Sequence, residues 1–496
     1  MKVYNTLSGE KEEFLPQGDE VKMYVCGVTP YDHCHFGHAM SYIAFDVIRR
    51  YLRFRGYKVK YVQNITDIDD KIIDRAGKLG ISPRELAEKY TNGYFEDMDA
   101  LNIERADIYP KATEEIPKII EVIQALVAKG YAYPVEGSVY FRVRNVANYG
   151  KLAHRSLESM RAAEGAMGSE EKEDAMDFAL WKASKPGEPW WESPWGQGRP
   201  GWHIECSAMS LKYLGDTLDI HGGGHDLIFP HHENEIAQSE SFTGKKPFVK
   251  YWLHNGLVQL GEDKMSKSLG NLVTIKQALE KYSPDAIRIF VLSSHYRSPL
   301  KYSEEGLEAA KRGLDRLAQA ISRNDSTGGK GMALEAQPYY NQFIEAMDDD
   351  FNTAQALAVL FDSAREINQV ADSGLSFQDA QGVLLSLARE VLGLKLPKTR
   401  TVQTVSVGGG AVKISGRLGI RRIIPDTVSA RVNRFIEERV KCREEKNWQR
   451  ADEIRKKLDE LGVTVEDTKV GTSVTYKSVP SEESLNNLMK ELGIDS

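Results

Sequence analysis

The feature that most constrains the fold of this chain is a strand–helix–strand pattern near its N-terminus. Residues 21–25 (VKMYV) form a short apolar run, and residues 39–56 (AMSYIAFDVIRRYLRFRG) place apolar side chains at helical spacing before a final glycine. Residues 57–65 (YKVKYVQNI) then alternate apolar and polar side chains, as a strand does. Two strands joined by a helix become parallel neighbours. The pattern therefore predicts an α/β fold with a doubly wound, Rossmann-like parallel sheet.

The rest of the chain divides into regions that differ in apolar periodicity and in charge. Beyond about residue 300 the apolar spacing becomes helical, which predicts an α-helical second half. Residues 395–424 carry seven Lys/Arg and no Asp/Glu, and their alternation on both sides of GGG predicts a hairpin or a linker that becomes ordered on binding. The C-terminal region predicts a charged helical pair over 427–462 and a second hairpin over 463–477.

Composition narrows the class of protein. Four cysteines among 496 residues do not make a disulfide scaffold, so a reducing compartment, the cytoplasm, is expected. No run of about 18 apolar residues occurs, and no membrane partner is expected. The net charge of −7 argues against a generally basic surface for nucleic acid but allows a local basic face.

Residues 264–268 (KMSKS), flanked by glycines, suit a loop that closes over phosphates. Lys264 and Lys267 supply positive charge to a polyphosphate, while hydroxyls and backbone amides complete the hydrogen bonding. The same composition also suits an ordinary solvated turn.

Residues 35–38 (HFGH) follow the first strand at the start of the predicted helix. Gly37 removes the side chain that would keep a flat ligand away from the backbone. The imidazoles of His35 and His38 can donate hydrogen bonds to a charged phosphoryl transition state. The alternative is a pair of histidines that cap the helix or lie on the surface.

Together, HFGH and KMSKS resemble the HIGH and KMSKS signatures of the class I aminoacyl-tRNA synthetases, with Phe36 in place of isoleucine. Residues 221–231 (HGGGHDLIFPH) also contain the class I pattern GxDxxxxH, as Gly224, Asp226 and His231. The resemblance implies a Rossmann-like catalytic domain that binds MgATP. It also implies that Gly37 lies against the nucleotide and that Asp226 binds the ribose hydroxyls.

Four residues of metal-ligand type lie in three separate segments: Cys26, Cys206, His231 and Glu235. His231 and Glu235 are four apart and share one face of a helix. Two sulfurs, one nitrogen and one oxygen make a plausible tetrahedral zinc set, although spacing alone equally allows four unrelated polar residues. The surrounding segments MYVCGVTPYD, GWHIECSAMS and FPHHENEIAQS resemble those of the cysteinyl-tRNA synthetases. In that family the four corresponding positions bind one zinc ion.

This resemblance implies the ATP-dependent ligation of L-cysteine to its cognate tRNA through a cysteinyl-adenylate, with zinc binding the substrate thiolate and excluding serine. It implies that His35, His38, Lys264 and Lys267 stabilise the transition state. Lys267 is the expected main contact of pyrophosphate. Thr66, Trp202 and His221 are the expected pocket residues. The expected partners are L-cysteine, ATP and the tRNA for cysteine, and the protein is expected to be a monomer.

The resemblance, together with the changes of composition and periodicity along the chain, implies the predicted domains. They are a first catalytic half over 1–112, a connective insertion over 113–200, a second catalytic half with the zinc ligands over 201–255, a stem-contact region with KMSKS over 256–310, a helical bundle over 311–395 and a small C-terminal anticodon-binding, tRNA-binding domain over 396–496.

Two alternatives remain at this point, and a third is rejected. Cysteine ligases of the mycothiol pathway resemble the same family but join cysteine to an amino sugar, are shorter and lack an anticodon-binding tail. A non-catalytic tRNA-binding relic would be expected to have lost its phosphate or zinc residues. A zinc hydrolase is disfavoured, because two thiolates together with KMSKS indicate sulfur recognition and nucleotide chemistry.

Overall fold

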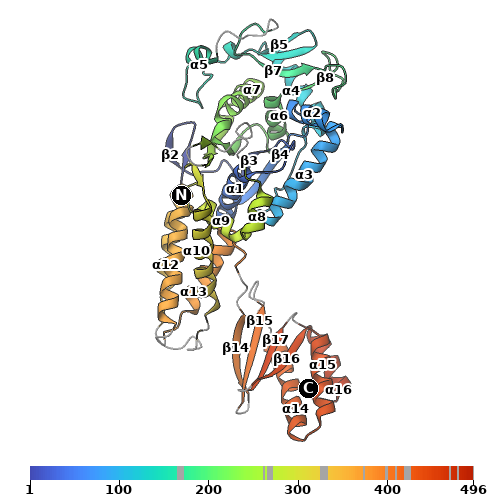
Figure 1. The fold of residues 1–496 in the computed structure, drawn as a ribbon, viewed down its shortest axis with the longest axis vertical. Coiled ribbons are helices and arrows are strands. Elements are labelled where there is room, and N and C mark those ends of the chain that lie inside the picture. The colour runs from blue at the N-terminus through green and yellow to red at the C-terminus, as the bar shows by residue number, and fades with distance from the viewer. Residues whose placement is uncertain are drawn as a thin grey trace. The chain divides into compact units, whose positions relative to one another are not determined.

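The parallel sheet expected from the sequence is present in the computed structural model, with strands in the order β10-β9-β3-β4 (Figure 1). These strands span Val249–Asn255, Leu218–Gly224, Glu20–Val28 and Lys58–Ile65, and each neighbouring pair is parallel. The structure describes residues 1–164, 172–260, 263–264, 272–323, 325, 333–371, 375–396, 400–407, 410–417, 426–468, 471–476 and 480–494. The predicted fold class is confirmed.

Two strand–helix–strand units make up this sheet. The first is β3, α1 (Phe36–Phe54) and β4, and the second is β9, α7 (Glu233–Thr243) and β10. Strands β3 and β9 are neighbours in the centre of the sheet. The first unit continues from β3 to β4 on one side, and the second continues from β9 to β10 on the other side, so the strand order reverses between β3 and β9. Ligands of such sheets bind at the carboxyl ends of the two strands where this reversal occurs. HFGH follows β3, and His225 and Asp226 follow β9, so both segments lie at that position.

Helices cover both faces of the sheet. Helix α1 packs on one face, where Phe45 lies so close to Gly222 that a Cβ atom on this glycine would be 2.3 Å from the ring. Helix α6 (Trp202–Leu214) packs on the other face, and its Cys206 and Met209 share a core cluster with Tyr24 and Cys26 of β3.

An insertion separates β4 from α6. It contains α2 (Asp70–Leu79), α3 (Pro83–Ala100), α4 (Ile116–Ala128) and α5 (Leu157–Glu164), together with an antiparallel sheet in the order β5-β6-β7-β8. The strands are Ala132–Val135, Ser138–Phe141, Phe178–Ala183 and Gly198–Pro200. Trp181 of β7 is fully buried in the cluster that joins this sheet to α4 and α6. The N-terminal strands β1 (Lys2–Asn5) and β2 (Glu10–Glu13) form a separate antiparallel pair.

The segment after β10 returns to the start of α1. It holds a small sheet in the order β12-β11-β13 (Asp263–Lys264, Val258–Leu260 and Leu300–Tyr302), helix α8 (Ile275–Lys281) and helix α9 (Pro284–Leu292). A β-bridge pairs His35 with Thr274, and the Phe36 N–H donates to Val273 O at 2.8 Å. The chain just beyond KMSKS is therefore paired by backbone bonds with the HFGH segment.

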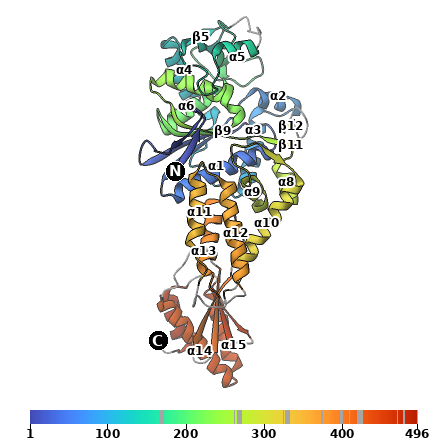
Figure 2. The same ribbon diagram turned by 90° about the vertical axis from the view of Figure 1, so that its left-hand side faces the viewer.

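A helical region follows, as the sequence predicts. It comprises α10 (Glu304–Ser322), α11 (Gln337–Asp348), α12 (Thr353–Val370), α13 (Gln378–Ser386) and a π-helical turn at Leu387–Val391 (Figure 2). Arg288 of α9 is fully buried and ties this region to the sheet domain. Its guanidinium donates to Asp46 of α1 at 2.6 Å and to Leu392 O at 2.8 Å.

The chain forms two packed units. The first contains Met1–Leu317, Glu335–Glu366 and Asp379–Lys395, and the second contains Ala318–Leu334, Ile367–Gln378 and Leu396–Ser496. The second unit includes a four-stranded sheet in the order β14-β15-β17-β16 (Arg400–Val407, Gly410–Arg417, Gly471–Tyr476 and Val463–Thr468). Three helices accompany it: α14 (Asp426–Glu444), α15 (Trp448–Glu460) and α16 (Glu482–Leu492). The helical pair and both hairpins expected from the sequence are confirmed, whereas the domain limits stay predictions.

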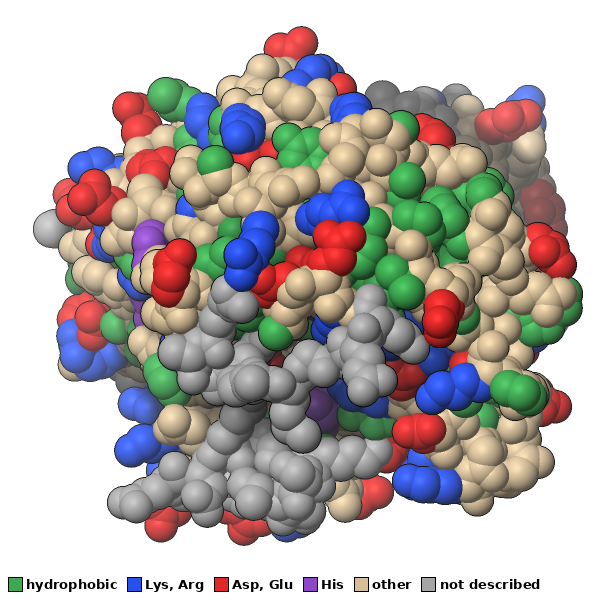
Figure 3. Space-filling view, turned by 90° about the horizontal axis from the view of Figure 1, so that it is seen from above, with side chains coloured by type: hydrophobic (Ala, Val, Ile, Leu, Met, Phe, Trp, Pro, Cys, Tyr) green, Lys and Arg blue, Asp and Glu red, His purple; other side chains and the backbone are tan. Residues whose placement is uncertain are grey.

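The surface of the described part of the chain is of mixed charge where it can be seen. Figure 3 shows one face, on which Lys and Arg side chains are interspersed with Asp and Glu. None of the helices described here is both long and apolar enough to cross a membrane.

Candidate metal centre and active site

The register of three parallel strands gathers polar side chains on one face of the sheet. Tyr24 of β3, His221 of β9 and Trp252 of β10 are direct register partners. Residues two apart in a strand share a face, so Cys26 lies beside Tyr24 on the same side, and His254 lies beside Trp252. This face meets α6 and α7, which bring further cysteine, histidine and glutamate side chains.

Four buried residues form a cluster that could hold a metal ion: Cys26, His231, His232 and Glu235, whose donor atoms all lie within 4.8 Å of one another. Glu235 Oε1 is 3.1 Å from His231 Nε2 and 3.8 Å from Cys26 Sγ. Cys26 Sγ is also 3.2 Å from His232 Nε2. The two histidines end the short π-helical turn Ile228–His232, and Glu235 follows in the first turn of α7. The three side chains therefore come from one continuous segment opposite β3.

Cys206 of α6 adjoins this cluster. Its Sγ atom is 4.0 Å from Cys26 Sγ, and its side chain also bonds His231. The structure thus brings the four predicted zinc ligands together and adds His232 as a fifth donor. Sequence reasoning missed His232, although it is adjacent to His231 in FPHHENE. A tetrahedral ion takes four donors, so the choice among the five stays a prediction.

The charges of the donor groups in this cluster suit the binding of a cation. The hydrogen bond from the Cys26 thiol lowers the pKa of Cys206 to about 6 despite burial. Burial would raise the pKa of Glu235, but His221 and His231 hold it at about 2. Burial, together with Cys206, raises the pKa of Cys26. Burial would lower the pKa of His231, but the Glu235 carboxylate raises it to about 10. The cluster therefore holds anionic donors together with protons on Cys26 and His231, which a divalent cation would displace.

Further histidines support the donor residues. His221 Nε2 is 2.9 Å from Glu235 Oε2, and its ring stacks on Trp252 at 4.5 Å. His232 Nδ1 is 2.8 Å from His254 Nε2, and His203 Nδ1 is 2.9 Å from His231 Nδ1. Such partners fix the ring orientation of metal ligands. His221 is fully buried here, and its predicted contact with substrate stays a prediction.

Trp202 and Thr66, the other two predicted pocket residues, lie beside this cluster in different ways. Trp202 is 38% exposed at the start of α6, and its ring stacks on His231 at 4.2 Å. Thr66 follows β4 and is buried, and its side chain bonds Glu205, the residue before Cys206.

A chain of hydrogen bonds runs from Thr66 to the other cysteine segment. Asn64 Nδ2 donates to Thr66 Oγ1 at 3.0 Å, and Asn64 Oδ1 accepts from the Gly27 N–H at 2.8 Å. A Cβ atom on Gly27 would lie 1.6 Å from Asn64 O, so only glycine fits after Cys26. The network Gly27–Asn64–Thr66–Glu205 therefore connects the residue after Cys26 with the residue before Cys206. Sequence reasoning did not find Asn64 or Glu205.

The two histidines of HFGH cap helix α1 through their Nδ1 atoms. His35 Nδ1 accepts from the Gly37 N–H, and His38 Nδ1 accepts from the His35 N–H, both at 3.1 Å. Burial, and then His35, lower the pKa of His38, so this ring is neutral. A neutral imidazole that accepts at Nδ1 carries its proton on Nε2. The caps therefore set the tautomer of both rings, with the Nε2–H as the donor.

The remaining predicted residues have separate positions. Asp226 is exposed directly after β9, at the carboxyl edge of the sheet. Lys264 lies in strand β12, and Lys267 lies outside the described residues.

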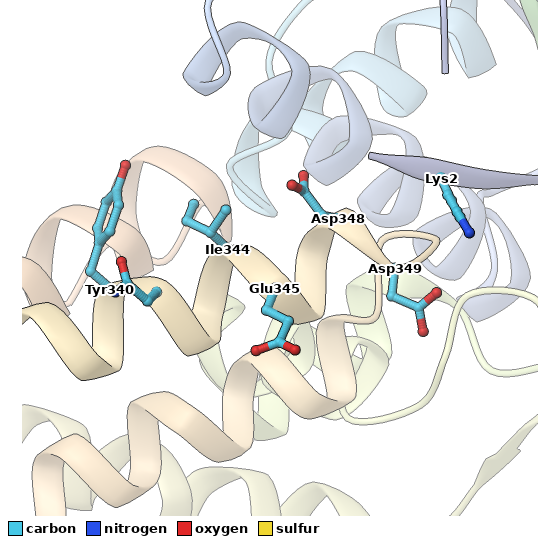
Figure 4. Close-up of a pocket in the computed structure, with 7 residues that line it drawn as sticks. Lys2, Tyr340, Ile344, Glu345, Asp348 and Asp349 are labelled. Carbon is cyan, nitrogen blue, oxygen red and sulfur yellow. The ribbon is translucent and has the colours of Figure 1, made fainter. Parts of the chain in front are cut away.

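A surface pocket of about 450 Å³ lies apart from all these residues, between α11 and the start of β1 (Figure 4). Two of its carboxylates are paired, since Asp348 bonds Tyr51 and Arg55, and Asp349 lies 2.6 Å from Lys11 Nζ. These pairs indicate a structural role for the two aspartates.

Comparisons with known proteins agree with this geometry. The family model "tRNA synthetases class I (C) catalytic domain" matches residues 14–312, the "DALR domain" matches 342–397, and the "Cysteinyl-tRNA ligase anticodon binding domain" matches 426–474. A cysteine–tRNA ligase of Dehalococcoides mccartyi is 56% identical over 95% of this chain and 99% of that protein. The cysteine–tRNA ligase of Geobacter sulfurreducens is 49% identical over 96% of this chain and 100% of that protein. Among solved structures, Mycobacterium tuberculosis methionyl-tRNA synthetase in complex with methionyl-adenylate shares the fold, with a TM-score of 0.57 at 18% identity over 76% of this chain and 92% of that one.

Proposed function

The chain belongs to the cysteine–tRNA ligases, class I enzymes that join cysteine to tRNA, and from this premise we propose how its residues divide the reaction. The match to an anticodon-binding domain over 426–474 argues against the amino-sugar ligases, which lack such a tail. The partners of the reaction are cysteine, ATP and the tRNA for cysteine. A monomer in the cytoplasm is part of the proposal. The described cysteines, none of which is in a disulfide, support a reducing compartment.

The proposed zinc ligands are Cys26, Cys206, His231 and Glu235. When bound there, zinc supplies affinity for a thiolate sulfur that the hydroxyl of serine does not match. Trp202, stacked on His231, borders the space beside these ligands, and Thr66 is held near them through Glu205 and Asn64. These contacts support a pocket for a small substrate with a thiol group.

In the first step the cysteine carboxylate attacks the α-phosphate of ATP, which forms cysteinyl-adenylate and releases pyrophosphate. The Nε2–H groups of His35 and His38, at the N-terminus of α1, donate to the phosphate oxygens as charge develops. Lys264 and Lys267 neutralise the pyrophosphate, and Asp226 accepts hydrogen bonds from the ribose hydroxyls. Gly37 leaves room for the nucleotide.

In the second step a hydroxyl of the terminal tRNA ribose attacks the carbonyl carbon of the adenylate, and AMP leaves. The 2′-hydroxyl is the expected nucleophile in a class I enzyme. Positioning of the two reactants accounts for most of the rate acceleration in this step, because no covalent intermediate with the protein is needed.

The single observation that carries the assignment of substrate is the thiolate-rich cluster beside an exposed tryptophan. We would follow pyrophosphate release and charging of tRNA in one reaction, with cysteine and with serine. The expected result is both signals with cysteine and neither with serine. Cys206→Ser should lose cysteine activity and bound zinc, whereas Cys442→Ser, which changes another buried cysteine, should keep both. Equal activity of Cys206→Ser and the wild type would contradict the proposal.

A further inference from the structure

Tyr24 of β3 is a fully buried tyrosine beside the metal cluster, and the proposed reaction gives it no role. It is the direct register partner of His221, and it lies on the same face of the sheet as Cys26, two residues further along the strand. Tyr24, Cys26 and Cys206 also belong to one core cluster. The register of the sheet therefore places a phenol beside the proposed zinc ligands.

The hydroxyl group of Tyr24 lacks the partner that a buried hydroxyl ordinarily has. Among the described residues, no group forms a hydrogen bond of ordinary geometry with its oxygen atom. A polar group buried in this way is costly, because water satisfied its hydrogen bonds in the unfolded chain. A phenol keeps its proton at neutral pH, so this hydroxyl is available as a donor to a nearby acceptor.

Cys206 is the acceptor best placed for this proton. The side chains that act electrostatically on the Tyr24 hydroxyl are Cys206, Cys26 and Glu235, and Cys206 has the largest effect of the three. Cys206 is also the one among them that interacts with this hydroxyl as a hydrogen-bond acceptor, although the contact falls short of a full hydrogen bond in distance or angle. A small movement of either side chain would complete it.

The other two candidate acceptors are engaged by histidines. The two carboxylate oxygens of Glu235 lie 3.1 Å from His231 Nε2 and 2.9 Å from His221 Nε2. The sulfur atom of Cys26 lies 3.2 Å from His232 Nε2. A thiolate, in contrast, has three lone pairs, so a cysteine sulfur that binds a metal ion can accept a hydrogen bond as well.

We propose that the Tyr24 hydroxyl donates a hydrogen bond to the Cys206 thiolate when zinc is bound, which makes Tyr24 a positioning residue for this ligand. The proposal rests on the ligand set argued above, in which Cys206 is a proposed zinc ligand. Partners of this kind orient a metal ligand and tune the metal. Through the hydrogen bond Tyr24 reduces the charge that Cys206 donates to zinc. More of the affinity of the ion then remains for a further sulfur atom, that of the substrate.

Tyr24→Phe removes the hydroxyl and keeps the ring. We expect zinc to bind about tenfold more weakly, as measured by competition with a chelating indicator, and the KM for cysteine to rise several-fold with little change for ATP. In the cobalt-substituted protein the sulfur-to-cobalt charge-transfer bands should move to longer wavelength, because the hydrogen bond no longer stabilises the electrons on sulfur.

Tyr61→Phe is the matched control. Tyr61 of β4 is also buried, but it is the register partner of Met23 and so lies on the opposite face of the sheet from Tyr24. This variant should keep the zinc affinity, the cobalt spectrum and the KM for cysteine of the wild type.

The melting temperature separates the proposed role from simple packing. With chelator, Tyr24→Phe should be at least as stable as the wild type, because it removes a buried hydroxyl that lacks a full hydrogen bond. With zinc it should be less stable than the wild type, because it binds the ion more weakly. An equal loss of stability under both conditions would show a packing role and overturn the inference.

Wild-type zinc affinity together with wild-type cobalt bands in Tyr24→Phe would overturn this inference, even if the KM for cysteine rose, and would leave the proposed function intact. A wild-type protein that binds no zinc, or that shows no cysteine-dependent pyrophosphate exchange, would instead overturn the proposed function.

Discussion

At the residue scale, the hydroxyl of Thr66 links the two cysteine segments through hydrogen bonds. It accepts from Asn64 and bonds Glu205, and Asn64 in turn holds the backbone after Cys26. A hydroxyl with two buried partners orders both of them, because an unpaired buried polar group is costly. The positions of the two cysteine segments thus depend on a residue that carries no charge.

Thr66→Val keeps the shape of this residue and removes its hydroxyl. We expect the variant to lose about 1–3 kcal/mol of unfolding free energy, because Asn64 and Glu205 are left without their shared partner. We also expect the KM for cysteine to rise several-fold, with a smaller change for ATP. Thr66→Ser is the matched control and should restore both quantities toward wild type. Steady-state kinetics and urea unfolding measure the two effects, and wild-type values for Thr66→Val would contradict the expectation.

Asp97 of α3 gives a prediction about pH. Burial raises the pKa of its carboxyl to about 6, with Lys276 acting in the opposite direction. A folded-state pKa above the unfolded value of 3.8 means that the folded protein holds this proton more tightly. The stability contributed by Asp97 is therefore present below about pH 4 and is lost as the pH rises through about 6. Asp97→Asn should raise the unfolding free energy by on the order of 1–2 kcal/mol at pH 8 and have little effect at pH 4. Denaturant unfolding at both pH values measures this, and an equal effect at the two would contradict it.

At the scale of one helix, the start of α1 explains why glycine stands between the two histidines. A Cβ atom on Gly37 would lie 2.9 Å from the His35 ring, which sits over this residue as the helix cap. Gly37→Ala should displace that ring and reduce the rate of pyrophosphate exchange on the order of a hundredfold, as the loss of one well-placed donor does. Gly93→Ala in α3 is the matched control, because no atom lies within 4 Å of its added Cβ. It should keep full activity and gain up to about 1 kcal/mol in stability. Equal activities of the two variants would show that the cap has no role.

Helices α1 and α9 meet through one buried ion pair. Arg288 and Asp46 are both fully buried at the side chain, and the arginine also donates to the backbone at Leu392. Arg288→Ala should cost about 1–3 kcal/mol, because the buried carbonyl group of Leu392 loses its donor while Asp46 keeps Arg50 at 2.9 Å. The double variant Arg288→Met with Asp46→Asn should recover part of that loss. Thermal unfolding of the wild type, Arg288→Ala and the double variant measures these changes in stability. Wild-type stability of Arg288→Ala would contradict a stabilising role for this ion pair.

Local periodicity predicted the helices and strands better than it predicted which of them lie side by side in the fold. The pattern over residues 21–65 is contained in one stretch of chain, so β3, α1 and β4 could be predicted from it. His254 could not be placed in this way, since its position near His232 depends on the register of β10 against β9. The hairpin at GGG was recognisable, but its parallel pairing with β17 joins segments about sixty residues apart. Contacts of this kind depend on the folded sheet rather than on neighbouring residues.

At the scale of the whole molecule, the metal cluster and the C-terminal core belong to different units. The cluster uses residues between Cys26 and Glu235, whereas the core of the second unit is formed by helices and strands between Val432 and Leu492. The family resemblance pointed to the four ligands because their flanking motifs are specific. It did not reveal His203 and His254, which reach the cluster from helix α6 and strand β10.

Removal of the metal should therefore destabilise only one unit. Chelation is expected to lower the melting temperature of the first unit by several degrees, since a ligand present at a thousand times its Kd contributes about 4 kcal/mol. The transition of the second unit should not move, because it holds none of the donors. Scanning calorimetry with and without chelator measures both transitions, and readdition of zinc is the control. A shift of the second transition, or of neither, would contradict this expectation.

The backbone pairing of His35 with Thr274 has a consequence for how such genes are recognised. Hydrogen bonds between residues 34–36 and residues 273–275 join the HFGH segment to the chain that begins a few residues after KMSKS. The length of the chain between these two segments does not enter into this pairing, and the insertion within it packs in a separate cluster with α6 and α7. Evolution can therefore lengthen or shorten the intervening chain without moving the catalytic groups. A genome search that requires a fixed number of residues between HFGH and KMSKS would discard true members of the family. A search that scores the two paired segments separately would retain them.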